Sequence, residues 1–127
     1  MRIAVSAAGP GPEAPAEERF GRCACFVIFD EQGNVEEVVD NAGKTAPEGA
    51  GVLSAQSLLR RKVSVVLTGR VGPKAMRALQ AGGVAVYTGI AGTVAETLAK
   101  YKSGRMQPAT PSAGSPGAGR RAGRRDG

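Results

Sequence analysis

Short hydrophobic runs alternate along this chain with segments in which apolar residues recur every three or four positions. The runs are rich in β-branched and aromatic residues and are bounded by glycine or polar residues, a pattern typical of β-strands. They predict strands at residues 2–5, 25–29, 35–39, 63–67 and 84–87. The second and third runs are separated by a short polar segment containing glycine, which predicts a β-hairpin.

The segments with helical spacing predict three helices. The first covers about residues 51–61, and the second begins at Pro73, since proline is tolerated in the first turn of a helix. The third begins at Thr93, which forms a Thr-x-x-Glu capping box with Glu96, and it ends near Gly104.

This order of elements predicts an α/β fold. Strand–helix–strand units require parallel strands joined by right-handed crossovers. The hairpin makes the second strand antiparallel to its neighbours, so its start lies beside the ends of the other strands. We therefore expect a mixed five-stranded sheet with three helices, in which the segment before residue 25 and the loops before the helices share one edge.

Four glycine-bearing loops lie at this predicted edge, at residues 20–25, 49–51, 69–73 and 89–93. Glycine lets the backbone approach a ligand closely, and exposed N–H groups at helix N-termini favour anions. We expect a basic, glycine-lined binding pocket made by Arg19, Gly21, Arg22, Gly49, Gly51, Gly69, Arg70, Gly72, Gly89, Gly92 and Thr93. The alternative is that the loops are only tight turns, and none matches a nucleotide-binding fingerprint.

Two cysteines, Cys23 and Cys25, lie in the first of these loops. Thiolates are soft ligands that suit iron–sulfur chemistry, and a two-residue spacing on a strand points both sulfur atoms to one face. We expect Arg19 and Arg22 to lower the thiol pKa values. Because two cysteines cannot complete a four-ligand site, binding needs a second subunit, an outside thiol or non-covalent capture. The alternative is that Cys25 is an ordinary buried apolar residue and Cys23 a loop thiol.

The composition excludes several kinds of active site. The chain has no histidine, which removes Ser-His-Asp and Cys-His catalysis and His-bound zinc. A two-metal nuclease needs clustered carboxylates, and the first predicted strand has none. Two cysteines are too few for a disulfide-stapled secreted domain, and the amino terminus leads into a strand without a signal peptide. We therefore expect a cytoplasmic protein, with no apolar run near the ~20 residues that cross a bilayer.

The net charge of +6 is unevenly distributed. Residues 103–127 hold five arginines and one acidic residue, a net charge of +4, whereas residues 1–102 hold 12 basic and 10 acidic residues, a net charge of +2. This near balance does not suggest a nucleic-acid partner. Residues 105–127 are rich in Gly, Pro, Ser, Ala and Arg, so we expect a domain at residues 1–104 and a disordered tail after it. The tail suits RNA, membrane or acidic partners through charge alone, or is simply solvated.

Five short motifs follow one another along residues 1–104. They are Met1-Arg2-Ile3-Ala4-Val5, Phe20-Gly21-Arg22, Gly49-Ala50-Gly51, Gly69-Arg70-Val71-Gly72-Pro73 and Gly89-Ile90-Ala91-Gly92-Thr93. In this order and spacing they resemble the dinitrogenase iron–molybdenum cofactor biosynthesis family. The resemblance implies a ribonuclease H-like three-layer fold and the binding of metal–sulfur clusters in nitrogenase cofactor assembly. Family members often carry histidine where this chain has Arg19 and Glu48, so histidine ligation is not expected.

The leading hypothesis is a non-catalytic protein that binds, carries or scaffolds an iron–sulfur or iron–molybdenum–sulfur cluster or its precursor. The glycine loops supply a polar cradle, arginines offset negative charge, and Cys23 and Cys25 are candidate metal ligands. Cluster-assembly proteins are the partners that the resemblance implies. The alternatives are a metal-free interaction or regulatory domain acting as a homodimer, and a binder of small anions.

Overall fold

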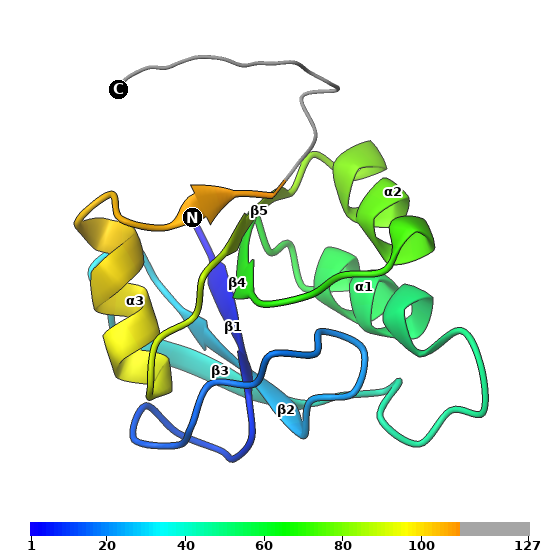
Figure 1. Cartoon of the computed structure of the whole chain (residues 1–127), viewed down its shortest axis with the longest axis horizontal. Coiled ribbons are helices and arrows are strands. Elements are labelled where there is room, and N and C mark those ends of the chain that lie inside the picture. Colours follow the sequence, from blue (N-terminus) through cyan, green and yellow to red (C-terminus); the bar gives the residue numbers. More distant parts are fainter. Residues whose placement is uncertain (110–127) are drawn as a thin grey trace.

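The computed structural model describes residues 1–109, and it places a mixed β-sheet between helices on its two faces (Figure 1). The strands are β1 (Ile3–Ala7), β2 (Cys25–Phe29), β3 (Val35–Asp40), β4 (Val65–Thr68), β5 (Ala85–Thr88) and β6 (Gln107–Pro108). The helices are α1 (Ala50–Arg60), α2 (Pro73–Ala81) and α3 (Val94–Lys102). The predicted mixed α/β fold with three helices is confirmed, and the ribonuclease H-like label stays a prediction.

The strands lie in the order β3-β2-β1-β4-β5-β6. β1 pairs in parallel with β4, and β4 pairs in parallel with β5. β2 is antiparallel to both β1 and β3, as predicted from the hairpin. Because Ala7 at the end of β1 pairs with Cys25 at the start of β2, the loop before β2 lies at the edge where β1 and β4 end.

Two hydrophobic cores lie on opposite faces of the sheet. α1 and α2 cover one face through buried side chains such as Leu58 and Leu79, and α3 covers the other through Leu98. Neighbouring residues of β1 alternate between the cores, with Ala4 in the first and Val5 in the second. A sheet buried on both faces needs continuous apolar strands, which explains why the sequence shows uninterrupted hydrophobic runs.

β1 continues two residues beyond its predicted end because its polar residue finds partners. Ser6 is fully buried, and its Oγ lies 2.7 Å from the carbonyl oxygen of Glu17 and 2.8 Å from the Oγ1 of Thr68. A buried hydroxyl is tolerated when it is hydrogen-bonded. These partners are far from Ser6 in sequence, so the run of apolar residues alone did not reveal them.

The prediction of five strands is wrong, because β6 adds a sixth strand at one edge of the sheet. Its two residues are exposed and carry no hydrophobic pattern; the strand forms because they pair with Tyr87 and Thr88 of β5. Met106, just before β6, is buried in the core on the α3 face. Residues 105–109 therefore belong to the fold instead of the predicted tail, and residues 110–127 of that prediction lie outside the described residues.

The packing of Met106 can be measured. We expect Met106→Ala to lower the free energy of unfolding by about 2 kcal/mol, because a buried methionine leaves a cavity when it is truncated. Urea denaturation measures the loss, with Leu53→Ala as the control, since Leu53 is 41% exposed on α1 and its truncation should cost less than about 0.5 kcal/mol. Equal losses for the two variants would contradict the placement of Met106.

Candidate functional site

Three of the predicted glycine loops contribute to one open surface pocket of about 420 Å³. Its lining residues are Gly21, Gly49, Ala50, Gly51, Val52, Gly72, Pro73, Lys74 and Ala75. We call this the α1–α2 pocket, because it lies where the first turns of α1 and α2 come together beside the loop before β2. The structure thus brings together four of the predicted site residues, namely Gly21, Gly49, Gly51 and Gly72.

Two of these glycines lie where an added side chain would be crowded. A Cβ atom on Gly21 would lie 2.9 Å from the nitrogen of Gly51, and one on Gly51 would lie 3.0 Å from the Cβ of Ala75. Gly49 has a φ of 73°, which favours glycine. Gly72 differs, because its φ is −66° and an added Cβ would meet nothing within 4 Å. The fold therefore does not require glycine at position 72, and the space above it is open.

The first turns of α1 and α2 present unpartnered backbone N–H groups to this pocket. Neither N-cap residue, Gly49 or Gly72, has a side chain to accept a hydrogen bond, and neither first turn has an acidic residue. Within residues 1–109, the first-turn N–H groups without a hydrogen-bond acceptor are those of Ala50, Gly51 and Val52 in α1 and of Lys74 and Ala75 in α2. Two helix N-termini and the Lys74 ammonium make this pocket favourable for a negative charge.

The N-terminus of α3 is closed by comparison. Thr93 and Glu96 form the predicted capping box: the Oγ1 of Thr93 accepts from the N–H of Glu96 at 3.1 Å, and the Glu96 carboxylate accepts from the N–H of Thr93 at 2.8 Å. The next two N–H groups, of Val94 and Ala95, donate to carbonyls of the loop after β1 at 2.9 Å each. The predicted site residues here are Gly89, Gly92 and Thr93. None of them lines the α1–α2 pocket, so the four loops do not form one pocket.

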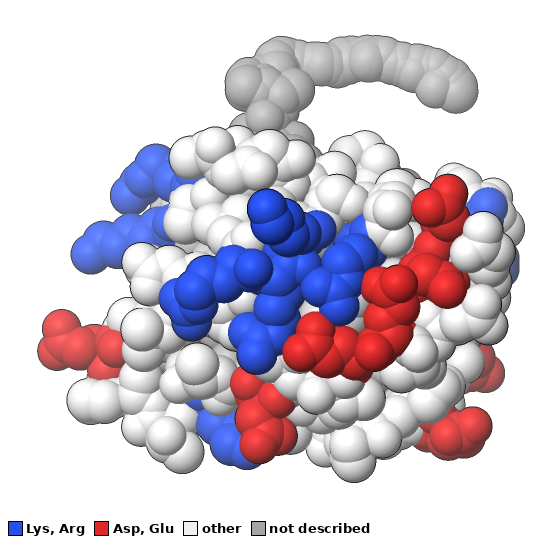
Figure 2. Space-filling view, turned by 180° about the vertical axis from the view of Figure 1, so that it is seen from behind, with Lys and Arg blue, Asp and Glu red and all other residues white. Residues whose placement is uncertain are grey.

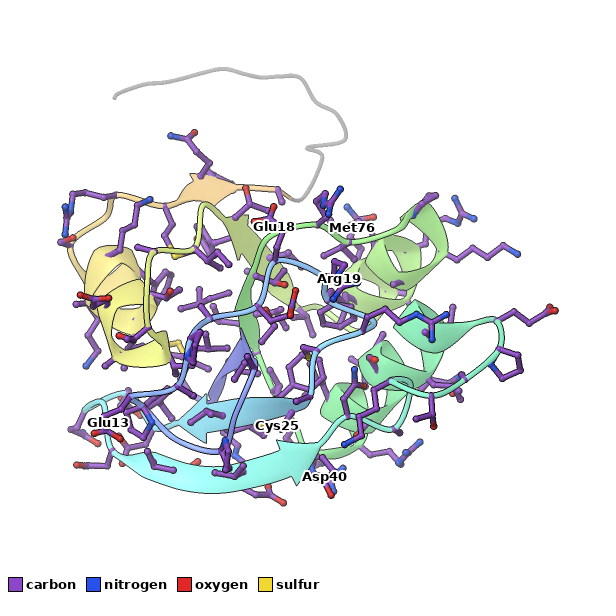
Figure 3. The ribbon with its side chains drawn as sticks, turned by 60° about the horizontal axis from the view of Figure 1, so that its bottom comes forward. Glu13, Glu18, Arg19, Cys25, Asp40 and Met76 are labelled. Atoms are coloured by element: carbon purple, nitrogen blue, oxygen red, sulfur yellow. The ribbon has the colours of Figure 1, made fainter. Side chains whose placement is uncertain are left out.

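Two predicted site arginines, Arg19 and Arg22, do not line the α1–α2 pocket. The guanidinium of Arg22 donates to the carbonyl of Ala46 at 2.7 Å, which braces the loop that leads into α1. Arg19 is paired with Glu17 at 3.3 Å, on the loop shown with its side chains in Figure 3. The Arg22 side chain therefore has a structural function, whereas the Arg19 side chain is 59% exposed and its ion pair contributes little to stability.

Gly69 and Arg70 belong to the contact between the end of β4 and the segment before Phe20. The N–H of Phe20 donates to the carbonyl of Arg70 at 3.0 Å. A Cβ on Gly69 would lie 2.4 Å from the carbonyl oxygen of Glu18, so glycine is needed there for packing. The Arg70 side chain is 74% exposed and lies 3.9 Å from the Glu18 carboxylate, a separation at which solvent screens the attraction.

Cys23 and Cys25 do not present their sulfur atoms to one face, contrary to the prediction. Cys23 packs into the core beneath α1 and α2, whereas Cys25 packs into the core beneath α3. Cys23 precedes the strand, so the alternation that governs strand residues does not apply to it. Cys25 begins β2 opposite Asp40, the last residue of β3 (Figure 3). The two side chains are 0% and 3% exposed, and neither lines the α1–α2 pocket.

The expected lowering of the thiol pKa values is also wrong. Burial raises the pKa of Cys23 to about 12, and burial raises the pKa of Cys25 as well. Neither arginine is among the groups that lower these pKa values: Arg19 pairs with Glu17, and the guanidinium of Arg22 donates to a loop carbonyl. In the described part of the chain, no group of three or more His, Cys, Asp or Glu side chains is arranged to hold a metal ion.

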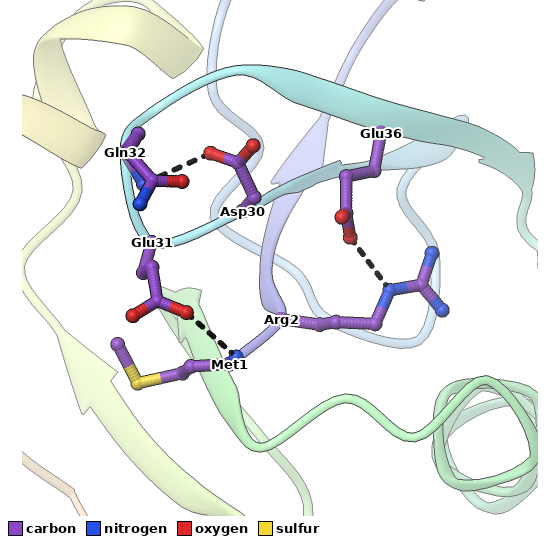
Figure 4. Close-up of a pocket in the computed structure, with 6 residues that line it drawn as sticks. All are labelled: Met1, Arg2, Asp30, Glu31, Gln32 and Glu36. Atoms are coloured by element: carbon purple, nitrogen blue, oxygen red, sulfur yellow. Dashed lines mark hydrogen bonds and ion pairs between the residues drawn. The ribbon is translucent and has the colours of Figure 1, made fainter.

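A larger hollow, of about 610 Å³, lies at the opposite end of β1. Figure 4 shows that its charged groups face one another, and they are paired: the amino group of Met1 lies 3.4 Å from Glu31, and Arg2 lies 2.9 Å from Glu36. Asp30 accepts from N–H groups of its own turn. These pairs use the polar groups of the hollow, which makes it a weaker candidate than the α1–α2 pocket.

Acidic and basic side chains also mix over the wider surface. Figure 2 shows Lys and Arg side chains beside a row of Asp and Glu side chains on one face. Among the ion pairs of the structure, Glu37 lies 2.9 Å from Arg2 and 3.3 Å from Arg61, and its hydrogen bond from Arg2 lowers its pKa. Paired charges of both signs differ from the single-sign stripe typical of nucleic-acid binding.

Lys74, the one ionisable residue that lines the α1–α2 pocket, was not among the predicted site residues. A signal was present in the sequence: Lys74 directly follows Gly72-Pro73, and a cation in the first turn of a helix opposes the helix dipole. α3 follows the opposite rule, with Glu96 in its first turn and lysines in its last. A local conflict of this kind is expected where a binding site is built.

Comparison with known proteins identifies relatives over most of the chain. The model of a family described as dinitrogenase iron-molybdenum cofactor matches residues 1–104. The apo form of the orange protein from Desulfovibrio gigas is 42% identical, with a TM-score of 0.80, over 85% of this chain and 92% of that chain.

Two further solved structures are similar to this chain. A putative NifB protein from Thermotoga is 34% identical, with a TM-score of 0.75, over 87% of this chain and 94% of that one. A putative dinitrogenase from Methanocaldococcus jannaschii is 13% identical, with a TM-score of 0.63, over 87% and 97% of the two chains, and it shows the shared fold alone. No curated protein matches the sequence. None of the helices within residues 1–109 has the length and apolar character needed to span a membrane.

The raised pKa of Cys23 predicts a dependence of stability on pH. Its pKa is about 12 in the folded chain, against 9.0 for a solvent-exposed thiol, so between these pH values the folded state keeps a proton that the unfolded state loses. The stabilisation is complete below pH 9.0 and is lost as the pH rises towards 12. Urea denaturation across this window should show the wild type losing up to about 1.4 kcal/mol per pH unit more than Cys23→Ala. Parallel curves would mean that the thiol is not buried as described.

Proposed function

The chain belongs to the dinitrogenase iron-molybdenum cofactor family, and from this premise we propose that it is a non-catalytic carrier or scaffold. Its cargo in this proposal is an iron–sulfur or iron–molybdenum–sulfur cluster or a precursor of one, and its site is the α1–α2 pocket. The observation that carries the proposal is the meeting of two uncapped helix N-termini at a glycine-lined surface.

The chemistry of such a cargo matches the groups that the pocket offers. Metal–sulfur clusters and thiometallates are anions with sulfide at their surface. Backbone N–H groups can donate hydrogen bonds to these sulfides, and the Lys74 ammonium offsets part of their charge. Since Cys23 and Cys25 are buried on opposite faces, we favour non-covalent capture over ligation by both thiols.

The residues that line the pocket favour the binding of a ligand over catalysis. Apart from Lys74, its residues carry only aliphatic side chains or none. General acid–base catalysis needs a group whose pKa lies near the working pH, and nucleophilic catalysis needs an activated hydroxyl, thiol or amine. A carrier needs neither, because it must only bind and release.

A small-anion binder is the second candidate. The N–H groups and the ammonium of the pocket are donors that serve phosphate or molybdate as well as a sulfide-bearing anion. The two candidates differ in which anion binds more tightly. Tetrathiomolybdate and molybdate provide a matched comparison, because both are tetrahedral dianions and differ only in sulfur against oxygen.

The test has two parts. Protein purified without oxygen and reconstituted with ferrous iron, molybdate and sulfide is analysed for bound metal and sulfide, and the apoprotein is titrated with tetrathiomolybdate and with molybdate. Bound cluster together with tighter binding of tetrathiomolybdate supports the carrier. Equal or tighter binding of molybdate supports the small-anion binder, and metal-free protein that binds neither anion contradicts both candidates.

Gly72 offers a variant that removes the site without weakening the fold. We expect Gly72→Asp to abolish tetrathiomolybdate binding, because the carboxylate caps α2 and puts a negative charge into the pocket. The melting temperature should stay the same or rise, since an N-cap aspartate stabilises a helix by a few tenths of a kcal/mol relative to glycine and a Cβ fits here. Isothermal titration and thermal melting measure the two effects.

The matched control is Gly72→Asn, which has the same shape without the charge. Asparagine also caps the helix, so any loss of affinity that it causes reports the capping alone. Unchanged tetrathiomolybdate binding by Gly72→Asp would exclude the α1–α2 pocket as the site.

A further inference from the structure

One buried side chain joins the separate segments that form the α1–α2 pocket. Asn41 follows β3, is 3% exposed and uses its whole hydrogen-bonding capacity. Its Nδ2 donates to the carbonyl oxygens of Gly21 at 3.1 Å and Cys23 at 2.9 Å. Its Oδ1 accepts from the N–H of Gly43 at 3.0 Å and from the Oγ of Ser54 at 2.5 Å. A single amide thus links the loop before β2, the loop after β3 and α1.

Two of these linked segments are walls of the pocket. Gly21 lines it directly, and Ser54 lies on α1 with its Oγ 3.0 Å from the carbonyl oxygen of Ala50, another lining residue. The contact between Gly21 and Gly51 is close, as a Cβ on Gly21 would lie 2.9 Å from the Gly51 nitrogen. The hydrogen bonds of Asn41 therefore help to set the distance between the Gly21 loop, which is one wall of the pocket, and the N–H groups in the first turn of α1, which is the other.

We infer that Asn41 is a positioning residue of the α1–α2 pocket: it holds the Gly21 loop against the first turn of α1 so that the unpartnered N–H groups converge on one anion. The inference rests on the proposed function, since it concerns the same site. It assigns to Asn41 an effect on affinity that is separate from its effect on stability. Cys23 is part of the same arrangement, because its Sγ lies 3.6 Å from the Nδ2 of Asn41 and beneath the pocket, where it packs instead of ligating.

The chain contains a matched control on the other face of the sheet. Thr97 is also fully buried and also ties down a glycine loop: its Oγ1 donates to the carbonyl of Ala91 at 3.0 Å and accepts from the N–H of Ala91 at 3.1 Å. This loop leads into α3, whose N-terminus is closed. Asn41→Ala and Thr97→Ala thus each remove a buried polar link to a glycine loop, and only the first link reaches the α1–α2 pocket.

The experiment titrates wild type, Asn41→Ala, Thr97→Ala and Ser54→Ala with tetrathiomolybdate, at a temperature at which thermal melting shows every variant fully folded. We expect Asn41→Ala to bind tetrathiomolybdate about tenfold more weakly than the wild type does. A loss of this size is typical when a residue that hydrogen-bonds to the binding groups of a metal site, and so orients them, is removed. Thr97→Ala should melt at a lower temperature and keep the wild-type affinity. Ser54→Ala, which removes one of the four hydrogen bonds, should show a smaller loss of affinity and carries the test if Asn41→Ala does not fold.

The outcomes separate the inference from the function on which it rests. If the wild type binds and Asn41→Ala binds with the same affinity, the inference is overturned and the proposed function stands. The same holds for Ser54→Ala where that variant carries the test. Equal losses in Asn41→Ala and Thr97→Ala also overturn it, because the effect then follows stability. Absence of binding by the wild type overturns both.

Discussion

The pairing of β1 is the constraint on which the rest of this structure depends. β1 is antiparallel to β2 and parallel to β4, and the register sets Ala7 opposite Cys25. This register carries the loop before β2 to the edge of the sheet from which α1 and α2 are reached. Without the antiparallel strand, Gly21 would lie at the far edge, and the α1–α2 pocket would lack one of its walls. The order and direction of the strands, more than any individual side chain, therefore bring the walls of the pocket together.

The three helix N-termini at this edge differ in whether their first-turn N–H groups have hydrogen-bond acceptors. The first turn of α3 satisfies its N–H groups with Thr93, Glu96 and carbonyls of the loop after β1, which leaves nothing for a ligand. The first turns of α1 and α2 have glycine N-caps and no acidic residue, and Lys74 of α2 lines the pocket that they share. Unpaired donors carry a free-energy cost unless water or a ligand accepts from them. Two neighbouring helices share this feature and the third does not, which supports the proposal that the α1–α2 pocket is an anion site.

The buried polar groups show how the pocket is supported. The amide of Asn41 is satisfied by four partners, and Ser6 with Thr68 bridges β1 and β4 near the same edge. Buried polar networks cost little when every member is paired, and they hold segments in one arrangement more strictly than apolar contacts do. The loops around the α1–α2 pocket are consequently held in place by buried hydrogen bonds, while the pocket itself stays open at the surface. A carrier that must accept and release an intact cargo benefits from such a preformed surface.

The sequence by itself determined the five main strands, the three helices, the antiparallel second strand and the capping box at Thr93, because periodicity and capping are local properties of the chain. It also indicated Gly21, Gly49, Gly51 and Gly72, since strand–glycine–helix spacing is visible in one dimension. Only the tertiary structure decided that Cys23 and Cys25 face different cores, that Gly89 and Gly92 lie away from the pocket, and that β6 exists. These features depend on burial and on partners distant in sequence, which no local pattern encodes.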